Sequence, residues 1–305
     1  MNGPLRCAVM IPTHNRLDDL RRTLDVVAQL DPPPDEVLIT ADGCTDGTVD
    51  FLRTQPHRVT VNRVPRGSTA SRDTMMREAA SELVLSLDDD SHPIERDAIA
   101  RVRALFAARP RLAVASFPQR SDETPASLTQ ADFGPAAFTG TYVNCACAFR
   151  RRVLPDLGGH FGAFWNAYDE PDFAVRCLAA GWEVRFEPSV TIRHHYSGLN
   201  RNHGRVHRMH ARNELWSVFL RCPAWQLPGV ALYRAARQFG YARRHGFAWM
   251  VREPQWWMAC LAGLPACLRH RRALPWPRYL AWMRLVRTPL HDEARWRALF
   301  GKEDR

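Results

Sequence analysis

The chain has 305 residues, of which 46% are hydrophobic and 24% are charged. A chain of this length can bury a sizeable core, and this composition excludes a largely disordered protein. The net charge of +10 is unevenly placed: residues 201–305 hold 20 basic and 6 acidic residues, a net of +14, which leaves a net of −4 for residues 1–200. The longest uncharged run, 254–268, is shorter than the ~18–20 residues that a spanning helix needs, and prolines interrupt it. We therefore expect a globular protein that does not cross a membrane and whose C-terminal third is basic.

Strand-like and helix-like segments alternate through the first 115 residues. Short apolar runs predict strands at 7–12, 35–40, 58–64 and 82–87. Helical spacing of apolar residues predicts helices at 17–27, 48–52, 68–80 and 93–108. This alternation predicts an α/β fold with a mostly parallel, doubly wound sheet flanked by helices. Ligands of such sheets lie beyond the carboxyl ends of the strands, where the polar clusters of this chain fall.

The next part of the chain is less regular. Residues 119–140 are rich in Ser, Thr, Pro and Gly, and predict a mobile loop. Further strands are expected at 141–149, 182–186 and 190–192, with a helix at 172–180 and helical structure from 203 onward.

The eight cysteines show neither a disulfide framework nor zinc-binding spacing. Cys145 and Cys147 alternate with small residues and are expected on one side of a strand. No signal peptide is visible at the start of the chain. These features predict reduced, mostly buried thiols in a cytoplasmic protein.

Three consecutive aspartates, Asp88, Asp89 and Asp90, follow the strand expected at 82–87. Adjacent carboxylates repel one another, so the loop gains little stability from them without a counter-cation. An Asp-x-Asp spacing at a strand end lets one carboxylate reach a divalent ion while the other reaches a sugar or ribose hydroxyl. Hard oxygen ligands of this kind suit Mg²⁺ or Mn²⁺. The alternative is a solvated acidic turn that caps the next helix.

A second polar cluster, DGCTDG at residues 42–47, is by itself an Asx-type turn in which Asp46 caps the following helix. Arg72 lies on a predicted helix between the two acidic clusters. Its guanidinium either pairs with a phosphate or with Asp88, or it is solvated.

Carboxylates also open the helix expected near 172. Asp169 and Glu170 either stabilise the helix N-terminus or include a general base for an incoming hydroxyl. His194, at the end of a strand and followed by a second histidine, is either a packing feature or the imidazole that completes an Asp/His metal site.

The order of these motifs resembles glycosyltransferase family 2, the inverting nucleotide-sugar enzymes with the GT-A fold. The resemblance covers about residues 5–215 and lies in the ordered set rather than in any single motif. The similar segments are VMIPTHNR at 9–16, ADGCTDG at 41–47, SRD at 71–73, LDDD at 87–90 and YDEPDFAVR at 168–176, followed by AGW at 180–182 and His194.

The resemblance implies a Rossmann-like GT-A glycosyltransferase domain over 1–215 and a basic, Trp-rich helical extension over 216–305. It implies that Asp90 binds Mg²⁺ or Mn²⁺, with His194 as a further ligand, and that Glu170 or Asp169 is the catalytic base. The residues implied in binding the nucleotide sugar are Pro12, Thr13, Asn15, Asp42, Arg72, Asp88 and Asp89.

Three positions depart from the family pattern. Ala41 replaces the first Asp of the paired motif, Asp73 replaces the usual Asn, and the order Asp169-Glu170 reverses the usual pair. The Q-x-x-R-W motif of the processive synthases is absent from the sequence. This absence predicts transfer of a single sugar. The resemblance implies a nucleotide diphosphate sugar as donor, a hydroxyl as acceptor and inversion at the anomeric carbon.

The basic C-terminal third suits a membrane interface, because Arg pairs with anionic headgroups and indoles prefer the headgroup boundary. A glycan or lipid-linked acceptor in cell-surface glycan synthesis, at the inner face of the cytoplasmic membrane, is the corresponding expectation. The alternative is a helical subdomain whose tryptophans form its own core. The residues concerned are Trp216, Trp225, Trp249, Trp256, Trp257, Trp276 and Trp282.

Other functions fit the sequence less well. The acidic strand ends would repel a nucleic acid, and no binding motif for one is visible. A nucleotidyltransferase normally has a Gly-rich loop after its first strand, and residues 12–15 (PTHN) are not one. An inactive sugar-binding relative is suggested by Ala41 and the altered carboxylate pair, and disfavoured by the retained Asp-x-Asp.

Overall fold

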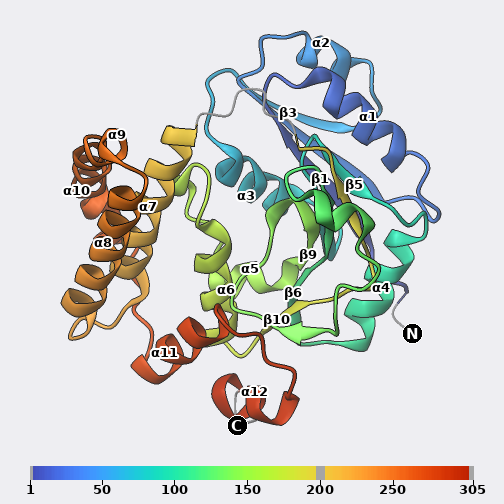
Figure 1. Cartoon of the computed structure of the whole chain (residues 1–305). Helices are drawn as coiled ribbons and strands as arrows, with labels where there is room; N and C mark the ends of the chain where they lie inside the picture. The colour runs from blue at the N-terminus through green and yellow to red at the C-terminus, as the bar shows by residue number, and fades with distance from the viewer. Residues whose placement is uncertain (1–2, 197–202, 302–305) are drawn as a thin grey trace.

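The computed structural model describes residues 3–196 and 203–301, with an eight-stranded sheet at the centre (Figure 1). Its strand order is β3-β2-β1-β4-β9-β6-β10-β8. Only β8 and β9 run against the other strands, which confirms the predicted mostly parallel α/β sheet. The strands are β1 (Cys7–Thr13), β2 (Glu36–Asp42), β3 (Arg58–Asn62), β4 (Leu83–Ser86), β6 (Leu112–Ser116), β8 (Ala137–Phe138), β9 (Cys147–Arg150) and β10 (Glu183–Phe186).

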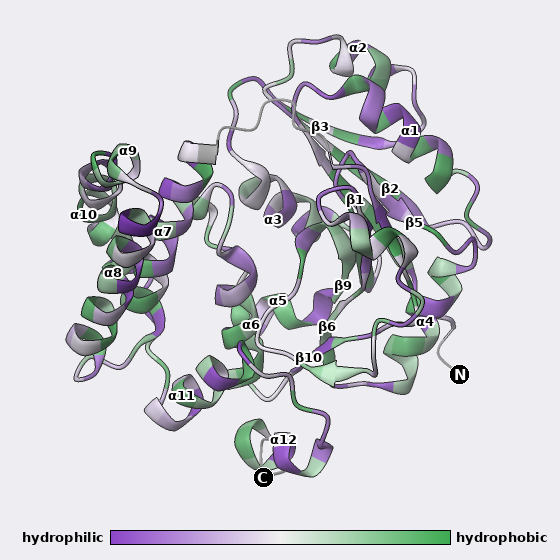
Figure 2. Cartoon of the chain, viewed as in Figure 1, coloured by the Kyte–Doolittle hydropathy of each residue, from purple (hydrophilic) through white to green (hydrophobic). Residues whose placement is uncertain are grey.

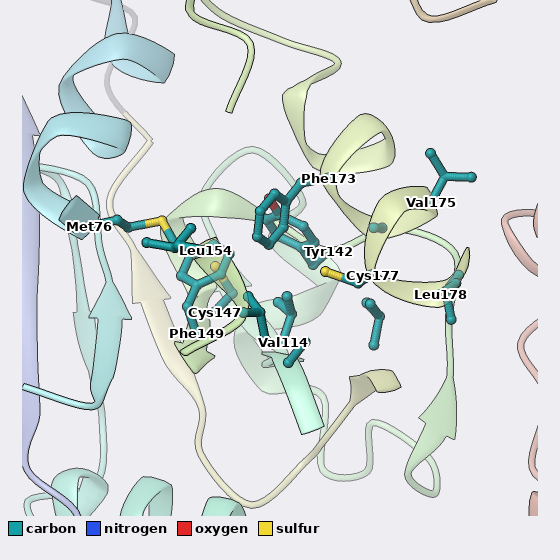
Figure 3. Close-up of a cluster of buried hydrophobic side chains, with 14 of the residues drawn as sticks. Met76, Val114, Tyr142, Cys147, Phe149, Leu154, Phe173, Val175, Cys177 and Leu178 are labelled. Carbon is teal, nitrogen blue, oxygen red and sulfur yellow. The ribbon is translucent and has the colours of Figure 1, made fainter. Parts of the chain in front are cut away.

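Helices cover both faces of this sheet because its strands alternate their side chains between two apolar layers. In β1, Ala8 and Met10 face one layer while Val9 and Ile11 face the other. The first layer includes residues of α3 and α6 (Figure 3), and the second includes residues of α1, α2 and α4. These helices are α1 (Leu17–Val27), α2 (Thr48–Arg53), α3 (Ser68–Glu78), α4 (Ala98–Ala108) and α6 (Asp169–Ala179), and a short α5 (Leu154–Leu157) precedes α6.

A second sheet of three strands lies beyond the carboxyl end of β4. It consists of β5 (Ser91–Pro93), β11 (Ile192–His194) and β7 (Gln119–Ser121), in that order. The pairing of His194 with Ser91 brings the histidine beside the three consecutive aspartates.

Helices form the C-terminal part of the molecule. Figure 2 shows hydrophobic and hydrophilic residues mixed along them. Among the described residues, no helix has the length and hydropathy that a membrane span requires. The helices are α7 (His203–Arg221), α8 (Leu227–Arg244), α9 (Phe247–Met250), α10 (Glu253–Arg269), α11 (Trp276–Leu285) and α12 (Glu293–Phe300).

The tryptophans of this region divide between core and surface. Trp216, Trp256 and Trp282 are buried, and the Trp216 indole donates to the carbonyl of Cys260 between α7 and α10. Trp225 is 70% exposed and Trp257 is 37% exposed. Several tryptophans therefore pack in the interior, so only part of the set is available to a membrane. Residue 215 lies inside α7, and the division of the chain at 215/216 stays a prediction.

Three local expectations were wrong. The helix expected from residue 93 begins at Ala98, because Pro93 lies in β5, an edge strand that tolerates proline. The loop expected at 119–140 contains β7, β8 and a 3₁₀ turn at Pro125–Thr129. The strand expected at 141–149 is confined to β9, which is preceded by a 3₁₀ turn at Asn144–Ala146. The expected free thiols are confirmed: all eight cysteines are free and seven are buried.

Candidate active site

Two loops at the carboxyl ends of β1 and β2 are bonded to each other. Asn15 has a left-handed backbone (φ 53°), and its side-chain oxygen accepts the amide of Thr45 at 2.6 Å. Asp46 accepts the amides of Leu17 at 3.1 Å and Thr48 at 3.2 Å. Asp46 thus stabilises the start of α2, and Asn15 fixes the shape of the loop after β2.

The three consecutive aspartates point in different directions. Asp89 accepts the Thr13 hydroxyl at 2.8 Å and pairs with Arg16 at 3.2 Å. Asp90 has no exposed surface and pairs with the same Arg16 at 2.8 Å. Asp88 keeps 30% of its side chain exposed and pairs with Arg72. The Arg16 guanidinium therefore relieves the repulsion within the run, and only Asp88 presents a carboxylate to solvent.

Asp88, Cys145 and His194 come together as possible metal ligands, with one ligand atom of each within 4.8 Å of the others. The Nε2 atom of His194 also lies 3.3 Å from Oδ1 of Asp90. Two carboxylates and an imidazole fit a hard divalent cation such as Mg²⁺ or Mn²⁺, whereas the Cys145 thiol is a softer donor. The sequence indicated Asp90 and His194, but it gave no reason to place Cys145 here.

Arg72 connects the aspartate run to the carboxylates that open α6. It is 3% exposed, it donates to Ser86 Oγ at 3.3 Å, and it pairs with Asp88. Burial disfavours its charged form, but the carboxylates of Asp88, Asp169 and Glu170 raise the pKa of Arg72. The side chain is therefore a permanent cation between the candidate metal ligands and the candidate base.

The two candidate bases differ in access. Asp169 is 2% exposed and accepts the Asn144 side-chain amide at 3.0 Å. Glu170 keeps part of its surface exposed. Burial, followed by the neighbouring Asp169 carboxylate, raises the pKa of Glu170 well above its usual range. A carboxyl group whose pKa is raised by burial and by a neighbouring carboxylate is a candidate general base.

Asp42 is used to hold a loop. Its Oδ1 accepts the Asn62 side-chain amide at 2.8 Å and the Arg66 amide at 2.9 Å, and its Oδ2 accepts the Gly67 amide at 2.8 Å. The φ of 88° at Gly67 and its close approach to Trp165 exclude a side chain there. A contact between Asp42 and a nucleotide stays a prediction, because these bonds already engage both carboxylate oxygens.

The segment before α6 has a strained backbone. Trp165, Ala167 and Tyr168 all have positive φ values, of 65°, 74° and 67°. Such conformations cost free energy and persist only where the surroundings enforce them. Asn213 of α7, fully buried, donates to three carbonyls of this segment, those of Phe164, Asn166 and Ala167 at 2.8, 3.1 and 2.9 Å.

The structure therefore brings most of the predicted site residues to one edge of the sheet. Pro12 and Thr13 end β1, and Thr13 is directed toward Asp89 rather than toward solvent. Residues that the sequence analysis did not assign to the site are Arg16, Cys145 and Asn213. Arg16 was visible in the opening motif, but its pairing with two aspartates depends on the fold.

Solved structures of glycosyltransferases share this fold. The 1–349 portion of TarS from S. aureus in complex with UDP is 17% identical, with a TM-score of 0.60 over 87% of this chain and 81% of that one. Mannosyltransferase PcManGT from Pyrobaculum calidifontis, with GDP-Man and Mn²⁺, is 20% identical, with a TM-score of 0.56 over 93% and 87%. GalNAc-T7 with UDP, GalNAc and Mn²⁺ is 13% identical, with a TM-score of 0.59, and this chain spans half its length.

At these identities the likeness shows the fold, a GT-A-like α/β arrangement with added C-terminal helices. Among curated proteins no sequence matches the chain. The sequence profile of Glycosyl transferase family 2 matches residues 8–160, which include β1, the aspartate run and the loop that follows α5. The chain therefore belongs to glycosyl transferase family 2.

Proposed function

We propose that this protein is an inverting glycosyltransferase that moves one sugar from a nucleotide diphosphate sugar to an acceptor hydroxyl. The observation that carries the proposal is the position of Arg72. Its buried guanidinium pairs with Asp88, which lies beside His194, and interacts with the Asp169 and Glu170 carboxylates. Candidate metal ligands and a candidate base thus lie on either side of the Arg72 guanidinium. A direct displacement at a sugar–diphosphate bond uses both, the metal at the leaving diphosphate and the base at the acceptor hydroxyl.

In the proposed reaction the acceptor oxygen bonds to the anomeric carbon as the bond from that carbon to the diphosphate oxygen breaks. Glu170 accepts the proton of the acceptor hydroxyl. A divalent cation, Mg²⁺ or Mn²⁺, bound by Asp88, Asp90 and His194 would stabilise the negative charge of the leaving diphosphate. Arg72 adds a fixed positive charge beside the same group. Inversion follows because the nucleophile and the leaving group lie on opposite faces of the sugar.

Glu170 suits the role of base better than Asp169. The Asp169 carboxylate is buried and already accepts the Asn144 amide. Glu170 retains exposed surface, so an acceptor hydroxyl has access to it.

The test of this function is release of nucleotide from a panel of UDP-, GDP-, dTDP- and CDP-sugars, with Mn²⁺ or Mg²⁺. Slow hydrolysis of one donor, lost with EDTA and in Asp90→Ala, is the expected result. Glu170→Gln should abolish transfer to an acceptor while leaving donor affinity unchanged. The matched control is Glu123→Gln, which removes an exposed carboxylate and should change neither. Absence of both hydrolysis and metal-dependent nucleotide binding would favour the inactive sugar-binding relative.

We also infer that the acceptor is a glycan or lipid-linked sugar met at an anionic membrane surface. The outer side of α10 supports this, because Met258, Leu261 and Leu268 are 63%, 63% and 59% exposed and no charged residue lies within 254–268. Leu261→Glu should reduce sedimentation with anionic liposomes. Val64→Glu is the control, since Val64 is 74% exposed but lies between β3 and α3. Equal sedimentation of both variants and the wild type would exclude α10 as the contact.

A further inference from the structure

A pocket of about 550 Å³ lies away from the acidic edge of the sheet. Its walls are the loop after α5, one side of α6, and the C-terminal ends of α7 and α10. None of its lining residues is acidic. Six arginines line it: Arg77, Arg176, Arg221, Arg269, Arg271 and Arg272.

Two of these arginines share one carboxylate. Arg221 donates to both oxygens of Asp172 at 2.7 and 3.0 Å, and Arg176 reaches the same carboxylate at 3.1 Å. A third, Arg77, pairs with Asp73 at 2.9 Å. Two carboxylates therefore balance three arginines, and the remaining three lining arginines add to the positive potential of the pocket.

The remaining arginines come from the end of α10 and the segment after it. Arg271 donates to the carbonyls of Phe219 and Cys222 and so joins this segment to α7. Arg269 and Arg272 are exposed, and their guanidinium groups make no hydrogen bond with another described residue. The pocket thus has a bonded arginine wall and two guanidinium groups with donors to spare.

Phosphate oxygens are the ligands that suit this arrangement. A guanidinium presents paired N–H donors that match a phosphate, and clustered arginines with few carboxylates attract an anion strongly. The loop lines the pocket with three glycines, at positions 158, 159 and 162, and the carbonyls of Gly158 and Gly159 accept from Arg176. The volume lies within the range of small-molecule sites, about 300–1,000 Å³.

We propose that this arginine pocket binds a phosphate or diphosphate group, separately from the nucleotide-sugar site. Arg176 follows Glu170 by six residues on α6, a rise of about 9 Å along the helix. The phosphate belongs either to a free anion or to a lipid headgroup. Leu268, which precedes Arg269 in α10, is 59% exposed, so its apolar surface is available to a lipid chain.

The test compares two double variants of the full chain. Arg269→Gln with Arg272→Gln removes the two guanidinium groups that have donors to spare. Arg243→Gln with Arg244→Gln is the control, because it removes the same charge from exposed positions at the end of α8. Both pairs lie on the surface, so neither variant is expected to unfold the protein, and thermal melting checks this.

Calorimetric titration with inorganic pyrophosphate in EDTA measures the free anion without a metal at the acidic site. Wild type and control should bind alike, and the pocket variant should bind at least about tenfold more weakly, as loss of charge-assisted hydrogen bonds predicts. Sedimentation of the same three proteins with phosphatidic acid vesicles measures binding to a lipid phosphate, and phosphatidylcholine vesicles are the reference.

If only the pocket variant loses affinity for pyrophosphate, the site is assigned to a free phosphate. If the pocket variant loses binding to the vesicles and not to pyrophosphate, the site is assigned to a lipid headgroup. Equal losses in both double variants would reduce the effect to net charge and overturn the proposal. No binding of either probe by the wild type would overturn it as well. Neither measurement depends on sugar transfer, so its outcome is independent of the test of the proposed function.

Discussion

Replacement of Asn213 by leucine tests whether the C-terminal helices hold the catalytic loop. Leucine has the same number and branching of side-chain heavy atoms as asparagine but removes the amide that donates to Phe164, Asn166 and Ala167. The side chain is fully buried, so water does not readily replace these bonds. The carbonyls lie in the segment that leads directly into Asp169 at the start of α6.

The expected magnitude follows from the bonds that are lost. The Asn213 amide has two N–H hydrogens for these three carbonyls, and at about 1 kcal/mol for each hydrogen their removal gives a loss of roughly 2 kcal/mol in the free energy of unfolding. The segment contains three non-glycine residues at positive φ, each of which costs about 1–3 kcal/mol to hold in place. We therefore expect the segment to relax when its bonds are removed. A displacement of about 1 Å at the base is enough to reduce kcat by about a hundredfold.

Urea denaturation followed by circular dichroism measures the stability, and kcat and KM are measured with the donor found by the nucleotide-release panel. The control is Ser217→Ala, one turn further along α7, because the buried Ser217 hydroxyl has no hydrogen-bond partner among the described residues. The control should be as stable as the wild type. If Asn213→Leu kept both wild-type stability and wild-type kcat, the loop would not depend on α7.

Further outcomes are expected for three residues, Glu170, Asp172 and Gly67. Burial and the carboxylate beside it raise the pKa of Glu170, so kcat/KM should rise about tenfold per pH unit up to that pKa, and a flat profile would exclude Glu170 as the base. Asp172→Asn should lower the free energy of unfolding by about 3–5 kcal/mol at neutral pH, because it leaves two buried arginines without their carboxylate. Burial raises the pKa of Asp172, but the two arginines outweigh burial and lower it. In urea denaturation, the wild type should therefore be more stable than Asp172→Asn at any pH above the carboxyl pKa of the unfolded chain. This difference in stability should disappear as the pH falls through the carboxyl pKa of the folded protein. Gly67→Ala should lower both the melting temperature and the turnover, since the new Cβ would lie 2.4 Å from the Trp165 carbonyl oxygen. Unchanged values would show that the loop accommodates the methyl group without loss of stability.

The fold could be predicted from the sequence because the apolar periodicity was strong in the first half of the chain. Strands β1, β2 and β4 are continuous apolar runs buried on both faces, and each ends at a polar motif. The start of α4 was missed because Pro93 fits the first turn of a helix as well as an edge strand. Short strands such as β7 and β8, of three and two residues, have no detectable period and depend on tertiary pairing.

Site residues could be predicted where they belong to a recognisable sequence motif. The aspartate run and His194 were visible as separate motifs, and their proximity follows from the pairing of β5 with β11. The positions of Cys145 and Asn213 at the site could not be predicted, because each residue lies beside a segment that is far away in the sequence. Asp73, a departure from the family pattern, pairs with Arg77 and accepts the His160 amide at 2.9 Å. This substitution thus stabilises the loop at the arginine pocket.

The arrangement of charge at the acidic edge gives a reason for a cation that is independent of the family resemblance. Five carboxyl groups lie there, those of Asp88, Asp89, Asp90, Asp169 and Glu170. Two arginines, Arg16 and Arg72, interact with them, and His194 lies 3.3 Å from Asp90. Burial, only partly offset by Arg16, raises the pKa of Asp89 to about 7, so full ionisation of the group is unfavourable in the folded protein. A divalent cation beside Asp88 would restore the balance, whereas a diphosphate alone would worsen it. Nucleotide affinity should therefore depend strongly on the metal, and the arginine pocket, whose charge is opposite, should bind its anion without one.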